Sequence, residues 1–251
     1  MIDLSGKCAV VTGGSRGVGR ATARLLAKAG AAVAIGYRSR TADADETVSQ
    51  LEALGVKALS VAADLSIAEG AEVLFSRAED ALGGIDIVIG NAGIWTSEPV
   101  AVAEMSAEQW RTTMAANVDA IFYTCREAAR RVRAGGSIVL VGSTAGQRGE
   151  AYHGDYAASK GAMGSLVKGF CVELAERDIN VNCVAPGWIE TEMSASALEG
   201  AERDRVAGSI PLGRIATAED IAGPIVFLCS TLGRHITGEI LNVNGGAVLA
   251  G

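Results

Sequence analysis

A tyrosine and a lysine stand four residues apart at Tyr156 and Lys160, in the sequence Tyr-Ala-Ala-Ser-Lys. In a helix this spacing places the phenol and the ammonium on one face. A free phenol has a pKa of about 10, and a nearby cation lowers that pKa by stabilising the phenolate. The pair therefore predicts general acid–base chemistry on a carbonyl or an alcohol, the alternative being an unrelated surface tyrosine and lysine.

A serine follows the apolar run Ser137–Gly142, which places Ser143 at the carboxyl end of a predicted strand. Tyr156 begins the next helical stretch, so both hydroxyl groups can face one crevice. A nucleophilic serine would need a histidine with an acidic partner, and neither His153 nor His235 shows such an arrangement in the sequence. We therefore interpret Ser143 as a hydroxyl that orients a substrate oxygen.

A glycine-rich turn, Gly13-Gly14-Ser15-Arg16-Gly17-Val18-Gly19, follows the predicted strand Lys7–Thr12 and precedes a helix. At the first strand–helix turn of a doubly wound sheet, glycines let the backbone approach a pyrophosphate, whose charge the helix N-terminus stabilises. The spacing G-x-x-x-G-x-G differs from the common G-x-G-x-x-G fingerprint. The turn predicts a dinucleotide site, the alternative being a tight connection that binds nothing.

The residues after the second predicted strand bear on the choice of dinucleotide. None of the five residues after Tyr37 is acidic, whereas an acid here would bind the ribose 2′-hydroxyl of NAD and repel a 2′-phosphate. Arg38 and Arg16 can pair with such a phosphate, and Ser39 or Arg40 can add a hydrogen bond. We therefore expect NADP(H) to be preferred over NAD(H); the alternative is that these arginines are solvated loop charges.

Short apolar runs that alternate with helical patterns must position these residues. The predicted strands are Lys7–Thr12, Ala32–Tyr37, Lys57–Ala62, Ile85–Gly90, Ser137–Gly142, Ile179–Val184 and Glu239–Val243. The predicted helices are Gly17–Ala29, Ala42–Leu54, Ala68–Leu82, Ala107–Arg133, Asp155–Arg177 and Ala218–Ser230. Continuous apolar strands between helices predict an α/β, single-domain Rossmann fold over residues 1–251, with a doubly wound seven-stranded parallel sheet and helices on both faces. The segment 188–214 breaks the alternation, and we expect it to be a substrate lid.

Composition excludes several classes of protein. The chain has 251 residues, 49% of them hydrophobic, and a formal net charge of -7, which argues against disorder and against nucleic acid as a partner. We find no apolar run of roughly 20 residues and no signal peptide, so no membrane is expected. The five cysteines form no C-x-x-C pair, which indicates free thiols in a reducing cytoplasm and no metal site.

Together these residues resemble the short-chain dehydrogenase/reductase family over essentially the whole chain. The resemblance rests on the motifs Thr12-Gly13-x-x-x-Gly17-x-Gly19, Asp64, Asn91-Ala92-Gly93, Asn117, Ser143, Tyr156-x-x-x-Lys160, Pro186-Gly187 with Thr191, and Ile236–Gly246. It implies hydride transfer between a nicotinamide and a carbonyl/alcohol pair. Tyr156 would be the acid/base, Lys160 would lower its pKa and bind the ribose, Ser143 would hold the substrate oxygen, and Asn117 would hold a water that relays protons to Lys160.

The resemblance also implies which residues contact the cofactor. They are Gly13, Ser15, Arg16, Gly17, Val18, Gly19, Tyr37, Arg38, Ser39, Asp64, Leu65, Asn91, Ala92, Gly93, Tyr156, Lys160, Pro186, Gly187, Ile189 and Thr191. On residue type alone, Asn91 and Asn117 are interpreted as structural, with the Asn117 side chain holding a water or a backbone carbonyl.

Within the family the chain is most similar to 3-oxoacyl-[acyl-carrier-protein] reductases, including the run Ile210–Arg214. This implies an NADPH-dependent reductase of 3-oxoacyl thioesters or similar ketones. A sugar, polyol or cyclic-alcohol dehydrogenase is the alternative, and a regulator without turnover would require a broken Ser–Tyr–Lys site. We expect the substrate pocket to be lined by Trp95, Gln147, Arg148, Glu150, Tyr152, His153 and Trp188.

Two expectations concern macromolecular partners. The resemblance implies a homo-oligomer, most simply a tetramer, paired through the helices Ala107–Arg133 and Asp155–Arg177, whose apolar residues include Ile121, Phe122, Tyr123, Leu166, Val167 and Phe170. Helical spacing of Arg126, Arg130 and Arg133 predicts a basic stripe on which an acidic carrier protein could dock. The alternative is that these arginines only complement the helix dipole.

Overall fold

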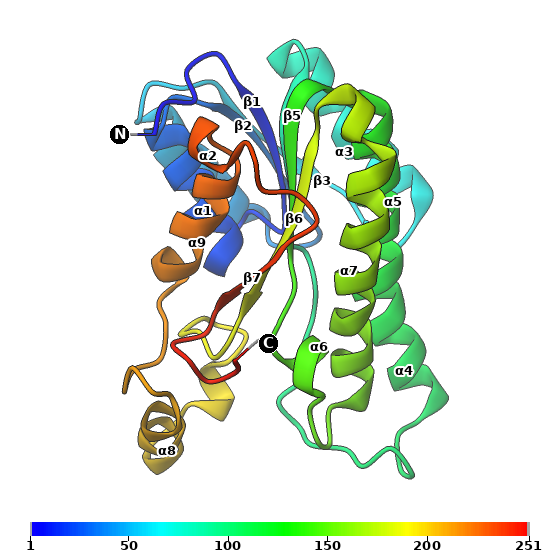
Figure 1. Cartoon of the computed structure of the whole chain (residues 1–251), viewed down its shortest axis with the longest axis vertical. Helices are drawn as coiled ribbons and strands as arrows, with labels where there is room; N and C mark the ends of the chain where they lie inside the picture. The colour runs from blue at the N-terminus through cyan, green and yellow to red at the C-terminus, as the bar shows by residue number, and fades with distance from the viewer. Residues whose placement is uncertain (1, 250–251) are drawn as a thin grey trace.

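A computed structural model describes residues 2–249. Seven parallel strands form one sheet in the order β3-β2-β1-β4-β5-β6-β7, with helices on both faces (Figure 1). The strands are β1 (Cys8–Thr12), β2 (Ala32–Tyr37), β3 (Ala58–Ala62), β4 (Ile85–Gly90), β5 (Val132–Val141), β6 (Asn180–Pro186) and β7 (Ile240–Val243). The single-domain, doubly wound fold predicted from the sequence is confirmed.

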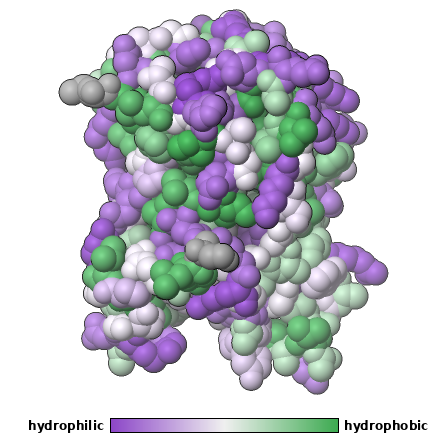
Figure 2. Space-filling view, viewed as in Figure 1, coloured by the Kyte–Doolittle hydropathy of each residue, from purple (hydrophilic) through white to green (hydrophobic). Residues whose placement is uncertain are grey.

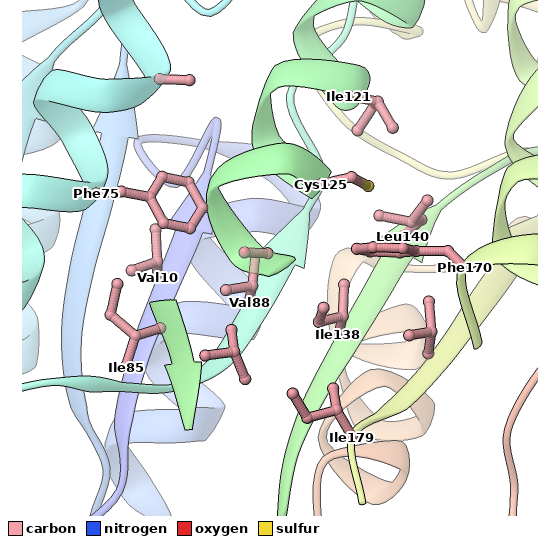
Figure 3. Close-up of a cluster of buried hydrophobic side chains, with 14 of the residues drawn as sticks. Val10, Phe75, Ile85, Val88, Ile121, Cys125, Ile138, Leu140, Phe170 and Ile179 are labelled. Atoms are coloured by element: carbon pink, nitrogen blue, oxygen red, sulfur yellow. The ribbon is translucent and has the colours of Figure 1, made fainter. Parts of the chain in front are cut away.

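The helices divide between the two faces of the sheet, as Figure 1 shows. They are α1 (Gly17–Lys28), α2 (Thr41–Glu52), α3 (Ala68–Leu82), α4 (Ala107–Met114), α5 (Ala120–Arg131), α6 (Ala145–Arg148), α7 (Gly154–Glu173), α8 (Ala201–Ser209) and α9 (Ala218–Leu228). One core lies beneath α1 and α9 and includes Leu26, Ile35 and Ile225. The other lies beneath α3, α5 and α7, where Phe75 and Phe170 pack toward the strands (Figure 3).

The strand order determines where a ligand can bind. After β1 the chain builds β2 and β3 on one side of it, then crosses to β4 on the other side. The crevice at such a reversal, outside the carboxyl ends of the strands, is the ligand site of doubly wound sheets. At this end of the molecule, the lower end in Figure 2, the surface is hollowed between the lobe containing α8 and the lobe containing α4 and α7.

The prediction of one long helix over Ala107–Arg133 is wrong in two respects. A π-helical turn at Ala115–Asp119 separates α4 from α5, and β5 begins at Val132, five residues earlier than predicted. Strand pairing sets this start, because Val132 lies opposite Ile85 of β4. Arg133 is therefore on a strand.

Of the predicted arginine stripe, only Arg126 and Arg130 lie on one helix, α5. Arg133 donates a hydrogen bond to the carbonyl of Gly83, while Arg130 pairs with the buried Glu127 at 2.9 Å. Arg126 lies over the ring of Tyr123 with its guanidinium carbon 5.0 Å from the ring centroid. Each of the three arginines thus has a partner within the chain, and docking of an acidic carrier protein on them stays a prediction.

The segment 188–214 has secondary structure that was not predicted, since it contains α8 and a short 3-10 turn at Ala195–Ala197. Val206, Ile210 and Ile215 form a small apolar cluster of their own, on which Trp188 packs. Most other element boundaries lie within two residues of the predicted ones, except that α7 ends four residues early, at Glu173.

Three further observations concern residues 2–249. None of their helices is both long enough and apolar enough to cross a bilayer, and no three His, Cys, Asp or Glu side chains gather as a metal site. All five cysteines are free and buried.

Candidate active site

A cleft runs along the carboxyl ends of β1, β2, β3, β4, β5 and β6. Its lining includes Ser143 and every residue predicted to contact the cofactor except Gly19. Sequence reasoning missed several other lining residues, namely Gly36, Ala63, Ser66, Ile94, Ala116, Ala120, Val141, Gly142, Glu192 and Met193. Some of these could have been found because they are the last residues of strands or follow them directly. No sequence signal marks Ala116 and Ala120, because Ala116 lies in the π-helical turn and Ala120 directly after it.

The glycine turn has the features of an anion site. No side chain caps the N-terminus of α1, and its first turn contains no acidic residue. Gly13 and Gly17 adopt φ angles of 63° and 52°, which favour glycine. A Cβ atom on Gly19 would lie 2.2 Å from the carbonyl oxygen of Gly13, so Gly19 lets the helix pack closely against the turn. The backbone N–H groups at the start of α1 thus fit a pyrophosphate.

Asn91 joins the loop after β4 to the glycine turn. Its side-chain amide donates hydrogen bonds to the carbonyls of Thr12, at 2.9 Å, and of Gly13, at 3.2 Å. The Thr12 hydroxyl in turn accepts from the backbone N–H groups of Asn91 and Ala92. These bonds hold the two strand ends together at the switch point, which agrees with the structural interpretation of Asn91.

The arginines beyond β2 lie at one end of the cleft. Asp43, the nearest acidic residue along the chain, pairs with Arg20 at 3.9 Å and with Arg40 at 3.6 Å, but not with Arg16 or Arg38. A hydrogen bond from Ser66 lowers the pKa of Asp64, which also lines this end, and the nearby charge of Arg38 lowers it further. The arrangement fits an adenosine whose ribose carries a phosphate beside the guanidinium groups.

The ammonium of Lys160 is buried at the other end of the cleft. It donates a 2.8 Å hydrogen bond to the carbonyl of Val141 and lies 5.8 Å from the centroid of the Tyr156 ring. Burial lowers the pKa of Lys160 to about 8. A lysine with this pKa exchanges a proton near neutral pH more readily than an exposed one.

The pKa of the Tyr156 phenol is raised, chiefly by burial. A hydrogen bond with Ser143 lowers this pKa, and the negative charge of Glu150 raises it. The sequence predicted that Lys160 lowers the pKa of Tyr156, but the net shift of this pKa is upward. The Lys160 ammonium binds the Val141 carbonyl, and burial outweighs the other contributions to the pKa of Tyr156. Tyr156 and Ser143 do lie together, as the sequence predicted.

Asn117 is fully buried and does not line the cleft. Its side-chain amide donates to the carbonyl of Ile94 at 3.0 Å and to the Ser159 hydroxyl at 2.9 Å, and its oxygen accepts from the N–H of Ile94 at 2.7 Å. The interpretation that this side chain holds a backbone carbonyl is correct, and these bonds assign it to positioning the loop after β4. That Asn117 holds a water that relays protons to Lys160 stays a prediction.

The chain is similar to known proteins over nearly its whole length. Residues 13–248 match the family model described as enoyl-(acyl carrier protein) reductase. The chain is 39% identical to an uncharacterized oxidoreductase of Escherichia coli, over 95% of this chain and 98% of that one. It is 37% identical to a 3-oxoacyl-[acyl-carrier-protein] reductase of Vibrio cholerae, with 98% of each chain covered. An L-rhamnose 1-dehydrogenase of Azotobacter vinelandii is 36% identical, with 97% of each chain covered.

A solved structure of a short-chain dehydrogenase from Burkholderia cenocepacia, in complex with NADP, is also similar. Its TM-score is 0.92 at 36% identity, over 97% of this chain and 98% of that one. The chain belongs to the short-chain dehydrogenase/reductase family. As a member of this family, the protein is an oxidoreductase that uses a nicotinamide cofactor. The cleft described above fits this cofactor.

The residues predicted to line the substrate pocket of this short-chain dehydrogenase/reductase separate into two groups. Trp95, His153 and Trp188 gather beside Tyr156. The others have different surroundings: Gln147 donates to Asn242 at 2.8 Å and lines a second pocket with Ser143 and Lys160, Arg148 pairs with Glu150 at 2.9 Å, and Tyr152 is 60% exposed.

Proposed function

We propose that this enzyme is an NADP(H)-dependent oxidoreductase that interconverts a ketone and a secondary alcohol. The observation that carries the proposal is that Ser143, Tyr156 and Lys160 line the same cleft as the uncapped start of α1. A bound nicotinamide would supply or accept the hydride. The side chains of this chain supply the proton and hold the substrate oxygen.

Tyr156 is the proposed general acid in the reducing direction. Its raised pKa keeps the phenol protonated at neutral pH, so it can donate a proton to a carbonyl oxygen. Ser143 holds that oxygen through its hydroxyl group. Lys160 is proposed to contact the ribose and to return the proton to Tyr156, with its pKa of about 8 favouring exchange.

Residues around the cleft support assignments for the rest of the cofactor. Gly13 to Gly19 hold the pyrophosphate, and Asp64 and Leu65 flank the adenine. Pro186 to Thr191 hold the nicotinamide end. Arg16 and Arg38, which do not pair with Asp43, support a preference for a 2′-phosphate and hence for NADP(H).

Two substrate classes follow from the relatives. The Vibrio cholerae relative is named for 3-oxoacyl-[acyl-carrier-protein] and the Azotobacter vinelandii relative for L-rhamnose. The first class, an unbranched 3-oxoacyl thioester or a similar ketone, is supported by overall likeness to the Vibrio cholerae relative. The second class, a ring-bearing alcohol, is favoured by the aromatic side chains beside Tyr156.

Three further assignments complete the proposal. Segment 188–214 acts as the lid, supported by its separate apolar cluster and by the presence of Thr191 in the cleft. A homo-oligomer is supported by Phe122, which is 50% exposed on α5. The buried free cysteines support a reducing compartment such as the cytoplasm.

The test is a turnover assay with a panel containing a 3-oxoacyl thioester, cyclic ketones and linear ketones, following the oxidation of NADPH and of NADH. We expect turnover of at least one ketone, with kcat/KM higher for NADPH. Cofactor binding without turnover of any ketone or alcohol would instead identify a regulator. A higher kcat/KM with NADH would contradict the assignment of Arg16 and Arg38.

A further inference from the structure

Aromatic side chains from three separate segments meet beside Tyr156. The Trp95 ring follows β4, and its centroid lies 5.2 Å from that of His153 and 6.5 Å from that of Tyr156. Trp188, which follows β6, contacts Trp95 edge-on at 5.8 Å with an interplanar angle of 89°. We call Trp95, His153 and Trp188 the aromatic wall.

The aromatic wall lies where a substrate must bind. The cofactor cleft is lined by Tyr156 and Lys160 but by none of the three wall residues. The wall therefore adjoins the phenol outside the space that a cofactor would fill. A substrate that receives a proton from Tyr156 has to lie within reach of its hydroxyl group, and the Trp95 ring lies beside the Tyr156 ring.

Backbone contacts fix two members of the wall. The N–H of Val100 donates to the carbonyl of Tyr152 at 2.8 Å, which ties the loop bearing Trp95 to the segment bearing His153. Tyr152 has a φ of 65°, a left-handed conformation that non-glycine residues seldom adopt and that is found at functional sites when the surroundings enforce it. Asn117 holds the same loop through Ile94, next to Trp95.

The third member belongs to a different unit. Trp188 packs on the apolar cluster of segment 188–214, and its carbonyl accepts a 3.2 Å hydrogen bond from Ala216. The wall thus joins the loop after β4 to the proposed lid. Both tryptophans are only partly buried, so a ligand that covers them removes further apolar surface from water.

From this geometry, and resting on the proposed function, we infer that the aromatic wall selects substrates in which a six-membered ring contains or adjoins the reacting carbon. A flat ring face can stack on an indole, which adds to the free energy of burying apolar area. An unbranched chain makes less contact with an indole face and loses more rotational freedom on binding. The Glu150 carboxylate, which acts on Tyr156, is paired with Arg148 at 2.9 Å, so the inference concerns the shape of the substrate and not its charge.

A ring of this kind can come from an apolar cyclic ketone or from a sugar in its pyranose form. We therefore compare cyclohexanone with 2-hexanone, which have the same number of carbon atoms, and test the oxidation of L-rhamnose and D-glucose separately. The wild-type enzyme should show a kcat/KM for cyclohexanone about tenfold above that for 2-hexanone, as expected for about 1.4 kcal/mol of stacking and burial. Oxidation of a sugar without turnover of either ketone would identify a sugar, and not an apolar cyclic ketone, as the ring-bearing substrate.

The decisive variant is Trp95→Ala, with Trp95→Phe as the conservative variant. Trp95→Ala should lower kcat/KM for the ring substrate about tenfold while changing that for 2-hexanone less than about threefold, and Trp95→Phe should restore most of the loss. Trp110→Ala is the matched control, because Trp110 is 43% exposed on α4 and outside the wall. Trp110→Ala should leave kcat/KM unchanged for both the ring substrate and 2-hexanone.

Equal loss on ring and linear substrates in Trp95→Ala, or equal wild-type kcat/KM for both, would overturn the inference. An unchanged affinity for NADPH in Trp95→Ala verifies that the variant folds. Binding is measured independently of turnover, by quenching of tryptophan fluorescence in Tyr156→Phe with NADP and either cyclohexanol or L-rhamnose. If neither ring alcohol binds more tightly than 2-hexanol, the inference is wrong even if the proposed oxidoreductase activity is present.

Discussion

The Nζ atom of Lys160 lies 2.8 Å from the carbonyl oxygen of Val141, the last residue of β5. Ser143 follows two residues later, so one strand end both anchors the lysine and supplies the serine. The same strand end therefore sets the geometry of the whole Ser143–Tyr156–Lys160 group. A buried ammonium with one carbonyl partner also makes the stability of the fold depend on pH.

Lys160→Met should change that pH dependence. The pKa of Lys160 is about 8 in the folded protein, against 10.5 for a free lysine, so between these pH values the unfolded chain binds more protons. Stability contributed by this residue therefore rises with pH from 8 to 10.5, and below pH 8 the buried charge costs about 3 kcal/mol.

Chemical denaturation of wild type and Lys160→Met, at several values between pH 7 and pH 10, measures this contribution. The stability of the variant relative to wild type should be greatest at pH 7 and should decrease as the pH rises. A difference that stays constant over this range would show that Lys160 is not perturbed by burial.

Gly19→Val should disrupt the dinucleotide site. A Cβ atom at this position would lie 2.2 Å from the Gly13 carbonyl oxygen and 2.6 Å from the Asn91 amide nitrogen, so the glycine turn and α1 must separate. We expect a loss of stability of about 2 kcal/mol or more and weaker NADPH binding. Gly208→Ala is the control, because a Cβ atom there meets nothing within 4 Å. Thermal unfolding and NADPH titration decide the outcome, and near-native NADPH affinity in Gly19→Val would contradict it.

Arg38→Asp should reverse the cofactor preference. The new carboxylate would repel a 2′-phosphate and accept hydrogen bonds from the 2′-hydroxyl group of NADH. We expect the ratio of kcat/KM for NADPH to that for NADH to fall at least about tenfold, equivalent to about 1.4 kcal/mol. Arg77→Asp on α3 makes the same change of charge away from the cleft and should leave the ratio unchanged. An unchanged ratio of kcat/KM in Arg38→Asp would show that Arg38 does not recognise the 2′-phosphate.

Phe122→Asp should weaken the proposed homo-oligomer. Of the apolar residues expected to form the interface, Ile121, Val167 and Phe170 are buried in this chain's own core, so exposed Phe122 carries the expectation. Light scattering at micromolar concentration should show an oligomer for wild type and a smaller species for Phe122→Asp. Val73→Asp, on α3, is the control for adding a charge at an exposed apolar position. A monomeric wild type would refute the proposal.

The sequence predicted the strands and much of the cleft lining because several predicted strands are apolar runs followed directly by a residue of the cleft, as Gly13 and Ser143 illustrate. The π-helical turn at Asn117 could not be predicted, since it accompanies hydrogen bonds to Ile94, 23 residues earlier in the chain. The early start of β5 likewise depends on pairing with β4. The direction of the Tyr156 pKa shift escaped prediction because burial is a property of the folded chain.

The most direct test of the central claim is the rate of NADPH-dependent ketone reduction by Tyr156→Phe, measured alongside its NADPH affinity. This variant keeps the aromatic ring and removes only the hydroxyl group that is proposed to donate the proton. We predict that kcat falls about 10²–10⁴-fold while NADPH affinity changes little, as expected when a positioned general acid is lost. An unchanged kcat in Tyr156→Phe would contradict the assignment of Tyr156 as the acid of this site.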